Sequence, residues 1–382
     1  MLNFLLTPFV AVAHFGWLRL FGFISFRAAG AAVTALVITF MVAPGIIDRL
    51  RRMKLHQIVR EGTPQSHLEK ATTPTMGGLI IVLATLFSTI LWARLDNRYI
   101  LLAMFSMLWM GVIGFWDDFL KLKQKQMGLK NTGLVERHKL IGQVILGLAL
   151  GWYIWKHPLS TLPGASTTLP FYKYILIIPV TAALGWLYVL FVTFVMVGTT
   201  NAVNMTDGVD GLAAGLTAIA AFTFAFFTYV IGRVDASTYL HIYYLKGSGE
   251  LTVFCAAIMG ACIGFLWYNT HPAQVFMGDT GSLALGGALA AIAILLKSEF
   301  LLLLIGGMFV AEMMSVILQR YVFKFRRKRY GLEYAQTHRV LRRAPLHHHF
   351  EEKGWDEAQV VVRFWILGIL FSFLALSTLK IR

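Results

Sequence analysis

The sequence predicts an all-α, polytopic integral membrane protein with about ten transmembrane helices and both termini on the periplasmic side. Of the 382 residues, 57% are hydrophobic and only 14% are charged, whereas about a quarter of a soluble globular protein is charged. Apolar stretches of bilayer-spanning length recur along the chain. The lysines and arginines gather in alternate loops between these stretches.

Ten stretches are predicted to cross the bilayer, which takes roughly 20 residues of helix. They cover residues 28–47, 76–93, 99–116, 140–155, 174–197, 211–232, 251–268, 280–296, 300–319 and 364–379. The fourth, eighth and tenth are short and need flanking polar turns. The ninth contains Glu312, which we expect to face the interior of the bundle because a charge in lipid is costly. Residues 1–23 predict an interfacial helix, not a cleavable signal, since their first basic residue, Arg19, follows the apolar part.

The basic residues predict how the spans are oriented. Five loops hold 23 of the 34 lysines and arginines, and they cover residues 48–75, 117–139, 198–210, 269–279 and 320–363. We therefore expect these loops to be cytoplasmic and to form one active site within a single transmembrane domain, residues 1–382. The net charge of +15 reflects this topology, so no nucleic acid partner is expected. Cys255 and Cys262 are interpreted as small core residues, since no disulfide framework or CxxC motif is present.

The stretch Gly111–Lys125, GVIGFWDDFLKLKQK, is the first candidate site. An uncharged run ends there at two adjacent aspartates, Asp117 and Asp118, and a carboxylate near the bilayer core costs about 2.5–3.5 kcal/mol. If the helix continues past the membrane, Asp117, Lys121 and Lys125 lie on one stripe, at i, i+4 and i+8. Such a stripe could bind an anion and also hold a base or a cation. The alternative is a helix end capped by solvated charges.

The third cytoplasmic loop is a second candidate, because its sequence NAVNMTDGVDG, residues 201–211, has no lysine or arginine. Asn204, Asp207 and Asp210 are spaced by three, so a helical turn would gather them on one side. Two acids and an amide without a basic partner suit a divalent cation, or the hydroxyl and ring N–H groups of a nucleoside. The alternative is a helix N-cap followed by an acidic first turn.

Three other loops add candidates. In NTHPAQVFMGDTG, residues 269–281, Asp279 precedes a span without a basic neighbour, and Phe276 could stack on a base or simply be buried. The turn KATTPTMGG, residues 70–78, presents backbone N–H groups that could hold phosphate. The last loop contains PLHHHFE, residues 345–351. Its histidines suit an anionic substrate better than zinc, because thiolate ligands are missing.

Together these loops predict phosphoryl transfer at the membrane surface. The carboxylates suit Mg²⁺, which usually shares its shell with water and substrate phosphates and would offset the charge of a diphosphate. A transporter is the alternative, since acids at a membrane edge also mark ion pathways. We favour an enzyme because transport sites lie near the bilayer midplane, and only Glu312 is predicted to be deep.

The chain resembles the phospho-N-acetylmuramoyl-pentapeptide transferases, the translocase I family of the polyprenyl-phosphate N-acetylhexosamine-1-phosphate transferase superfamily. The resemblance spans essentially the whole chain. It depends on KATTPTMGG, GFWDDFLKLK, NAVNMTDGVDGLAAG, NTHPAQVFMGDTGSL and PLHHHFE, in that order. Each motif is modest alone, whereas the ordered set is specific. Superfamily members that use UDP-N-acetylglucosamine share the aspartate motifs but not the HHHFE form, which favours a muramoyl donor.

The resemblance implies a reaction: UDP-N-acetylmuramoyl-pentapeptide and undecaprenyl phosphate give lipid I and UMP, with Mg²⁺, in peptidoglycan synthesis. It implies that the protein lies in the bacterial cytoplasmic (inner) membrane, in contact with membrane lipid. It leaves open whether the protein forms a homodimer. Direct attack by the lipid phosphate is preferred over a covalent intermediate, because it needs only positioning and charge neutralisation.

The resemblance also implies roles for individual residues. Asp117 is the candidate base on the lipid phosphate, with Asp118 beside it, and Asp279 is the candidate Mg²⁺ ligand. The nucleotide and metal side would be lined by Asn204, Asp207, Asp210, Asn269 and Phe276. Phosphate, nucleoside or sugar would be bound by Lys70, Thr75, Lys121, Lys125, Lys139, His347, His348 and His349.

Overall fold

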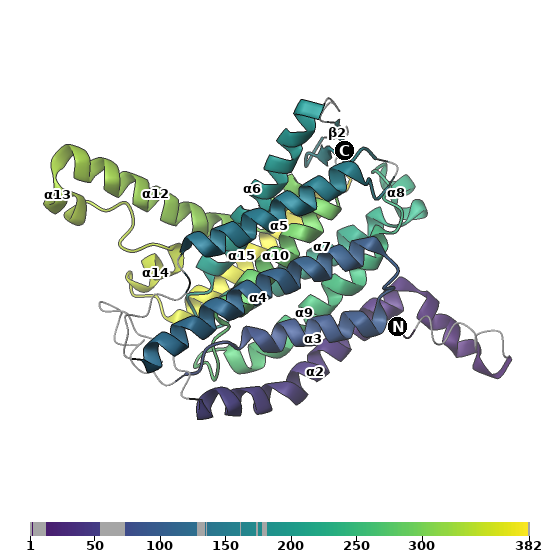
Figure 1. Ribbon diagram of the computed structural model, residues 1–382, viewed down its shortest axis with the longest axis horizontal. Coiled ribbons are helices and arrows are strands. Elements are labelled where there is room, and N and C mark those ends of the chain that lie inside the picture. Colours follow the sequence, from purple (N-terminus) through teal and green to yellow (C-terminus); the bar gives the residue numbers. More distant parts are fainter. Residues whose placement is uncertain are drawn as a thin grey trace.

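A computed structural model describes residues 2, 13–53, 73–127, 134, 136–160, 162–172, 175–177 and 182–380. The described chain is a bundle of long helices (Figure 1). These helices are α2 (Ile24–Arg52), α3 (Gly78–Trp92), α4 (Arg98–Gln126), α5 (Glu136–Lys156), α6 (Ala182–Thr206), α7 (Leu212–Ile231), α9 (Leu251–Asn269), α10 (Gly278–Leu295), α12 (Gly307–Tyr330) and α15 (Glu357–Ser377). The shorter elements are η2 (Ala13–Gly22), α8 (Val234–Leu240), η5 (Ser248–Glu250), α11 (Glu299–Ile305), α13 (Leu332–Thr337), α14 (Leu346–Glu351), and the paired strands β1 (Ser166–Thr168) and β2 (Ile175–Ile177).

The helices confirm a multi-pass membrane protein. Within the described residues, seven helices are long and apolar enough to cross a bilayer: α2, α4, α6, α7, α9, α10 and α15. An eighth span results if α11 and α12 are one bent span. The helix α3 is shorter, with 15 residues, and α5 carries charges at both ends. The prediction of ten spans therefore stays a prediction, although each predicted stretch overlaps a helix.

The ninth predicted span is wrong as a single straight helix. The structure divides it at Gly306 into α11 and α12, whose axes differ by 87°. Gly306 and Gly307 lack side chains, and the ring of Phe371 packs where a Cβ on Gly307 would lie. Sharp helix kinks commonly occur at such glycine pairs. Beyond the break, α12 continues to Tyr330 and projects from the bundle together with α13 (Figure 1).

Several predicted loops are also partly helical. The helix α4 continues to Gln126 and α6 to Thr206, so both pass the ends predicted from hydropathy. Hydropathy marks where the apolar residues stop, whereas helical hydrogen bonding continues into water when side chains support it. The predicted 174–197 span is wrong at its start, because residues 175–177 form β2 and α6 begins at Ala182. The pair β1–β2 is an exception to the all-α prediction.

The helix α10 occupies the centre of the bundle. Every residue from Thr280 to Leu295 is buried, and α10 packs against α3, α4, α6 and α7. Glycines allow this close packing, since a Cβ on Gly78 would lie 2.1 Å from Gly281 N and one on Gly114 would lie 2.1 Å from Asp279 O. Small residues at helix contacts are typical of membrane bundles. The N-terminus of α10, with Asp279, is thereby held against α3 and α4.

Helix α2 begins, and helix α15 ends, at the same end of the bundle (Figure 1). At the start of α2, Arg27 forms a buried ion pair with Glu250 of η5, with Nη2 to Oε1 at 2.6 Å. After α15, the Lys380 ammonium lies over the ring of Tyr239 in α8. Asp117 and Asp279 lie at the opposite ends of α4 and α10 from these contacts.

Candidate active site

Three carboxylates and two lysines converge where α4, α5 and α10 meet. Because α4 continues past its apolar part, Lys121 reaches Asp117 one turn earlier, with Nζ to Oδ2 at 2.5 Å. The same ammonium lies 2.9 Å from Asp279 Oδ2 and 3.9 Å from Asp118 Oδ1. The predicted stripe of Asp117 and Lys121 is therefore present, and it points at the first turn of α10.

Lys139, at the start of α5, completes the cluster. Its Nζ lies 2.7 Å from Asp117 Oδ2 and 2.5 Å from Asp279 Oδ2. The two lysines thus share the same pair of carboxylate oxygens. The other oxygen of Asp117, Oδ1, accepts a hydrogen bond from Leu134 N at 2.7 Å. Only weak sequence evidence pointed to Lys139, because the loop before it, residues 126–138, agrees in length alone with the family that the chain resembles.

Asp118 holds the N-terminus of α10 in place. Its Oδ1 accepts from Asp279 N at 3.2 Å, and its Oδ2 accepts from Thr280 N at 2.9 Å and Thr280 Oγ1 at 2.7 Å. Asp118 is buried, and a carboxylate stabilises the N–H groups that have no partner within the helix at its N-terminus. Asp118 is therefore a positioning residue for Asp279, a role that adjacency in sequence to Asp117 does not indicate.

The end of α6 supplies the fourth side of the cluster. Asn204 Nδ2 donates to Asp279 Oδ1 at 3.0 Å and to Ser282 Oγ at 2.9 Å. Asp207 follows in the turn after α6. Burial, and then the negative charges of Asp279 and Asp118, raise the pKa of Asp207 to about 8. The site thus concentrates more carboxylates than its two ammonium groups can neutralise.

The carboxylates of the cluster fit a divalent metal ion such as Mg²⁺. One oxygen each of Asp117, Asp118 and Asp279 lies within 4.8 Å of the others. Asp117 Oδ2 is buried without a well-formed hydrogen bond, although two ammonium groups approach it closely. Carboxylate oxygens are hard ligands of the kind that Mg²⁺ prefers. Asp118 is bonded to backbone N–H groups of α10, whereas Asp117 Oδ2 and Asp279 Oδ2 are held by the side chains of Lys121 and Lys139, which a metal ion could displace.

The predicted grouping of Asn204 with Asp210 on one side of a helical turn is wrong. The helix α6 ends at Thr206, four residues before Asp210, so Asp210 does not lie on the helical face that carries Asn204. Asp210 instead belongs to a second group, in which His271 Nδ1 lies 3.2 Å from Asp210 Oδ2 and 3.5 Å from Glu357 Oε2.

Asn269 is a structural residue in this arrangement. Its Oδ1 accepts from Gly211 N at 3.1 Å, and its Nδ2 donates to Val275 O at 2.9 Å. Since the side chain is buried and both ends of the amide are bonded within the protein, it fastens the loop before α10 to the start of α7.

The three histidines have three different environments. His347 is buried and packs against Gly208, and its Nδ1 lies 3.2 Å from Glu312 Oε1. Glu312 is itself fully buried, so it faces the interior of the bundle as predicted. His348 Nδ1 lies 2.6 Å from Glu351 Oε2. His349 Nδ1 accepts from Arg342 N at 3.1 Å. They do not form one shared set of donors.

Burial changes the charge of two of these histidines. It lowers the pKa of His348, against the opposing influence of Glu351. Burial, and then the charges of Lys353 and Arg342, also lower the pKa of His349. Both imidazoles are therefore neutral near pH 7. The N–H of His349, on Nε2, can donate to an anion, whereas the one N–H of His348 is donated to Glu351.

The turn before α3 lies against the first turn of α10. Phe276 N donates to Pro74 O and Gly77 N donates to Phe276 O, both at 2.8 Å. Thr75 Oγ1 would lie 2.9 Å from a Cβ on Gly278, which has φ +72°. Thr75 and the partly buried Phe276 therefore border the cluster. Of the remaining predicted residues, Lys70 and the side chain of Lys125 lie outside the described part of the chain.

Sequence reasoning missed three residues that the structure brings to these groups. Thr280 and Ser282 follow Asp279 directly and bond Asp118 and Asn204, so their place in the same motif was the available signal. Glu357 accepts from Asp210 N at 2.9 Å. In the sequence, Glu357 is indistinguishable from the acid that helices favour in their first turn.

Comparison with known proteins shows which family the chain is similar to. The sequence model of Glycosyl transferase family 4 matches residues 99–297, which include the acids at the ends of α4, α6 and α10. The fold and site thus define a membrane-embedded transferase of that class.

Curated relatives narrow the class to one family. A phospho-N-acetylmuramoyl-pentapeptide-transferase of Gemmatimonas aurantiaca is 66% identical over the full length of both chains. Proteins with the same name from Methylacidiphilum infernorum and Chlorobium chlorochromatii are 47% and 45% identical, over 97% and 100% of both chains. The chain belongs to the phospho-N-acetylmuramoyl-pentapeptide transferase family.

Proposed function

We propose that the protein transfers phospho-N-acetylmuramoyl-pentapeptide from UDP to undecaprenyl phosphate at the cytoplasmic face of the bacterial inner membrane. The products are lipid I and UMP, and Mg²⁺ is the cofactor. One observation carries the proposal: Asp117, Lys121, Lys139, Asn204 and Asp279 come from four helices and meet within hydrogen-bonding distance. Such a group can bind phosphates and hold a metal at one place.

The exposure of these side chains suggests the order in which they meet substrate. The side chains of Lys121 and Lys139 are 35% and 21% exposed, whereas that of Asp117 is fully buried behind them. An incoming lipid phosphate therefore meets the two ammonium groups first. Once they pair with the phosphate, Asp117 Oδ2 loses its two ammonium partners and can accept the phosphate's remaining proton.

The reaction then needs little more than alignment. The lipid phosphate oxygen attacks the phosphorus that bears the sugar, and the bond from that phosphorus to the UMP oxygen breaks. Lys121 and Lys139 offset the charge of the two phosphates, and Asn204 and Asp118 keep Asp279 in place. Asp279 would hold Mg²⁺, which when bound supplies charge neutralisation of the diphosphate.

The direct test is UMP release by purified protein. We expect release from UDP-N-acetylmuramoyl-pentapeptide when undecaprenyl phosphate and Mg²⁺ are both present, and much slower release from UDP-N-acetylglucosamine. Equal rates with the two donors would contradict the muramoyl assignment. No release from either donor would contradict transferase activity altogether.

The membrane orientation has a separate test. Cysteines introduced at Lys123 and Arg342, both exposed, should react with a membrane-impermeant thiol reagent only from the cytoplasmic side. The native Cys255 and Cys262 are fully buried, so their background labelling should be low. Labelling of either introduced cysteine from the periplasmic side would overturn the topology, and with it a site open to a cytosolic donor.

A transporter receives no support from this structure. Glu312 was the acid predicted to be deep in a span, and it contacts His347 of α14, in the same loop as the other histidines. It therefore belongs to the loop side of the bundle and is not an isolated charge near the midplane.

A further inference from the structure

Glu357, the first residue of α15, connects two loops that are far apart in the sequence. One of its oxygens, Oε1, accepts a hydrogen bond from Asp210 N at 2.9 Å. The other, Oε2, lies 3.5 Å from His271 Nδ1. Asp210 belongs to the loop 207–211, between α6 and α7, and His271 belongs to the loop 270–277, between α9 and α10. One carboxylate thus joins three segments of the chain.

The same two loops also bond each other directly. Asp210 Oδ2 accepts from Ala273 N at 3.2 Å and lies 3.2 Å from His271 Nδ1. Asp210 and Glu357 are buried, whereas the side chain of His271 is 39% exposed. Glu357 therefore fastens a pair of loops, which are already in contact, to a third element, the start of α15.

The hydrogen bonds favour a connection between loops over a metal site. One ligand atom from each of Asp210, His271 and Glu357 lies within 4.8 Å of the others, which is close enough to hold a metal ion. Each carboxylate, however, already accepts a backbone N–H, Asp210 from Ala273 and Glu357 from Asp210. A neutral imidazole with its proton on Nδ1 can donate to either carboxylate. The protein's own groups therefore account for the arrangement.

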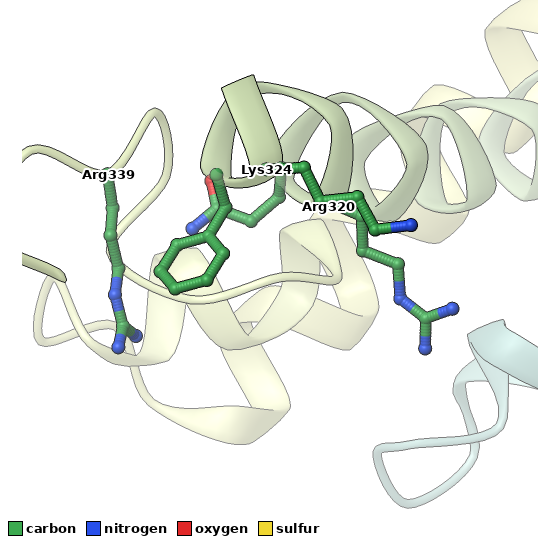
Figure 2. A pocket seen from close by; sticks show the side chains of 5 residues that line it. Arg320, Lys324 and Arg339 are labelled. Atoms are coloured by element: carbon green, nitrogen blue, oxygen red, sulfur yellow. The ribbon is translucent and has the colours of Figure 1, made fainter. Parts of the chain in front are cut away.

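The pocket beside α12 differs from this group. Its volume is about 410 Å³, and it is lined by Gln319, Arg320, Phe323, Lys324 and Arg339. The charged ends of Arg320, Lys324 and Arg339 point apart (Figure 2), and all three side chains are exposed. Cations that diverge into water do not surround one ligand, whereas Glu357 and its partners converge inside the protein.

The loop 207–211 also contacts the acid–lysine cluster. Asp207, in this loop, accepts a hydrogen bond from Gly278 N, at the start of α10. The next residue of α10 is Asp279, and Asn204, just before the loop, donates to Asp279 Oδ1 at 3.0 Å. A shift of the loop would therefore disturb the surroundings of Asp279.

The composition of the two loops suits a nucleoside better than a phosphate. Residues 201–211 and 269–281 contain no lysine or arginine, whereas Lys121 and Lys139 reach the cluster from α4 and α5. Phosphates pair with cations, whereas the hydroxyl, carbonyl and ring N–H groups of uridine pair with backbone, amide and carboxylate groups. If Asp279 holds the metal on the diphosphate, the uridine can extend along the two loops beside the start of α10.

We propose that Glu357 is a positioning residue for the uridine nucleotide: it holds the loops 207–211 and 270–277 in the arrangement that receives the nucleotide end of the donor. The inference depends on the proposed function, because only that function gives the site a uridine nucleotide. Glu357 acts through Asp210 N and the imidazole of His271 and does not itself touch the nucleotide. Its loss therefore weakens nucleotide binding and leaves the acids and lysines of the cluster in place.

The test measures the Kd of UMP for purified full-length protein in Mg²⁺. Glu357→Leu removes both contacts and should raise this Kd about tenfold, roughly the value of one charged hydrogen bond. Glu357→Gln keeps an oxygen that can accept from Asp210 N, so its Kd should stay within about threefold of wild type. His271→Ala should raise the Kd several-fold, whereas His271→Asn keeps an N–H near the position of Nδ1 and should restore most of the affinity.

Kinetics distinguish positioning from a purely structural role. In Glu357→Leu the KM for the donor should rise about as much as the Kd of UMP, while kcat and the KM for undecaprenyl phosphate change by less than about twofold. Asp356→Ala is the matched control, because Asp356 Oδ2 accepts from Ala358 N and caps the same helix, α15. This variant should lower the midpoint of thermal unfolding and leave the Kd of UMP unchanged.

The proposal is overturned if Glu357→Leu and His271→Ala both bind UMP as wild type does, or if Glu357→Gln loses as much affinity as Glu357→Leu. It is also overturned if Asp356→Ala weakens UMP binding equally, because fraying of α15 would then explain the effect. One Zn²⁺ per chain that wild-type protein binds and Glu357→Gln does not would assign the group to a metal instead. If Glu357→Leu does not fold, the two His271 variants decide the outcome in the same way.

The two proposals fail in different ways. Absence of UMP release from the donor by wild-type protein would overturn the transferase reaction and the positioning role together. Normal UMP release by wild type, with the Kd of UMP unchanged in the Glu357 and His271 variants, would overturn the positioning role alone.

Discussion

The helix α10 joins two charged clusters that differ in almost every physical respect. At its start, Asp279 meets Asp117, Lys121 and Lys139 in a group that is open to solvent on the lysine side. Beyond its end, Lys297 and Glu299 lie in a group that is closed to solvent, with 6% and 2% exposure. Both clusters combine lysine and carboxylate at one end of the same buried helix.

The closed cluster satisfies its polar atoms. Glu299 accepts from Thr167 Oγ1 at 2.6 Å and from Tyr188 OH at 3.1 Å. The Lys297 ammonium donates to Gly164 O and, at 3.0 Å, to Tyr188 OH. Burial lowers the pKa of Lys297 to about 8. This cluster ties the β1 segment to the turn between α10 and α11.

The open cluster leaves its charges unbalanced. Three carboxylates face two ammonium groups, and the nearby Asp207 is neutral near pH 7 because its pKa is raised to about 8. A charged cluster that is fully hydrogen-bonded and closed to solvent stabilises a fold, whereas crowded like charges at an opening favour binding of a counter-ion or substrate. The contrast indicates that the presence of charged residues alone is a poor guide to function. Solvent exposure and the hydrogen bonding of the charged groups separate the two clusters.

The largest expected effect breaks the closed cluster. Lys297→Met should destabilise the protein by about 3–5 kcal/mol, because it removes the hydrogen bonds to Gly164 O and Tyr188 OH and leaves the buried Glu299 without a nearby positive charge. UMP release per folded molecule should stay near the wild-type value, because the cluster is at the far end of α10. Thermal unfolding in detergent measures the loss. Lys246→Met, at an exposed position, is the control and should change stability by less than about 0.5 kcal/mol.

The open cluster should show the opposite behaviour. Asp117→Asn and Asp279→Asn should each lower kcat by about 10²–10³-fold, or about 2.7–4 kcal/mol. The midpoint of thermal unfolding should change little, since each substitution removes one of several crowded negative charges.

Magnesium dependence sharpens this prediction. Asp279→Asn should raise the Mg²⁺ concentration needed for half-maximal activity, whereas Asp117→Asn should leave it nearly unchanged, because the proposed role of Asp117 is toward the lipid phosphate. Equal shifts in the two variants would contradict the separate roles. Asp96→Asn is the control, because Asp96 is exposed, distant from the cluster and paired with Arg94.

The histidines are expected to divide between the two kinds of behaviour. His348→Ala or His349→Ala should lower kcat/KM for the muramoyl donor by about 1–3 kcal/mol, the cost of removing a partner from a charged group. The KM for undecaprenyl phosphate should change little. His347→Ala should instead lower the unfolding temperature, because His347 is buried against Glu312. Normal donor kinetics in both the His348→Ala and the His349→Ala variants would leave the loop with a structural role only.

The smallest effect concerns pH. The pKa of His348 is lowered by burial, so its neutral form stabilises the fold above the unfolded-state pKa of about 6.5. That contribution is lost as pH falls through the folded-state pKa. Wild-type protein should therefore lose more thermal stability between pH 7.5 and 5.5 than His348→Gln does. His241→Gln, an exposed site at the other end of the bundle, should behave like wild type.

Much of the site could be predicted from local patterns. The pairing of Asp117 with Lys121 follows from helical spacing once the helix continues past the apolar run, and the structure shows that it does. The inward orientation of Glu312 follows from the cost of a charge in lipid. These features depend on residues within one helix, so the sequence by itself was enough to determine them.

Other features depend on how separate helices pack, and only the tertiary structure decided them. Lys139 meets Asp279 because α5 and α10 converge on α4. Asp118 caps α10 because Gly114 lets the two helices approach closely. Adjacent Asp117 and Asp118 thus acquire different roles, and three consecutive histidines acquire three environments. Hydropathy and spacing describe one helix at a time, whereas these contacts depend on the shapes of the neighbouring helices that pack against it.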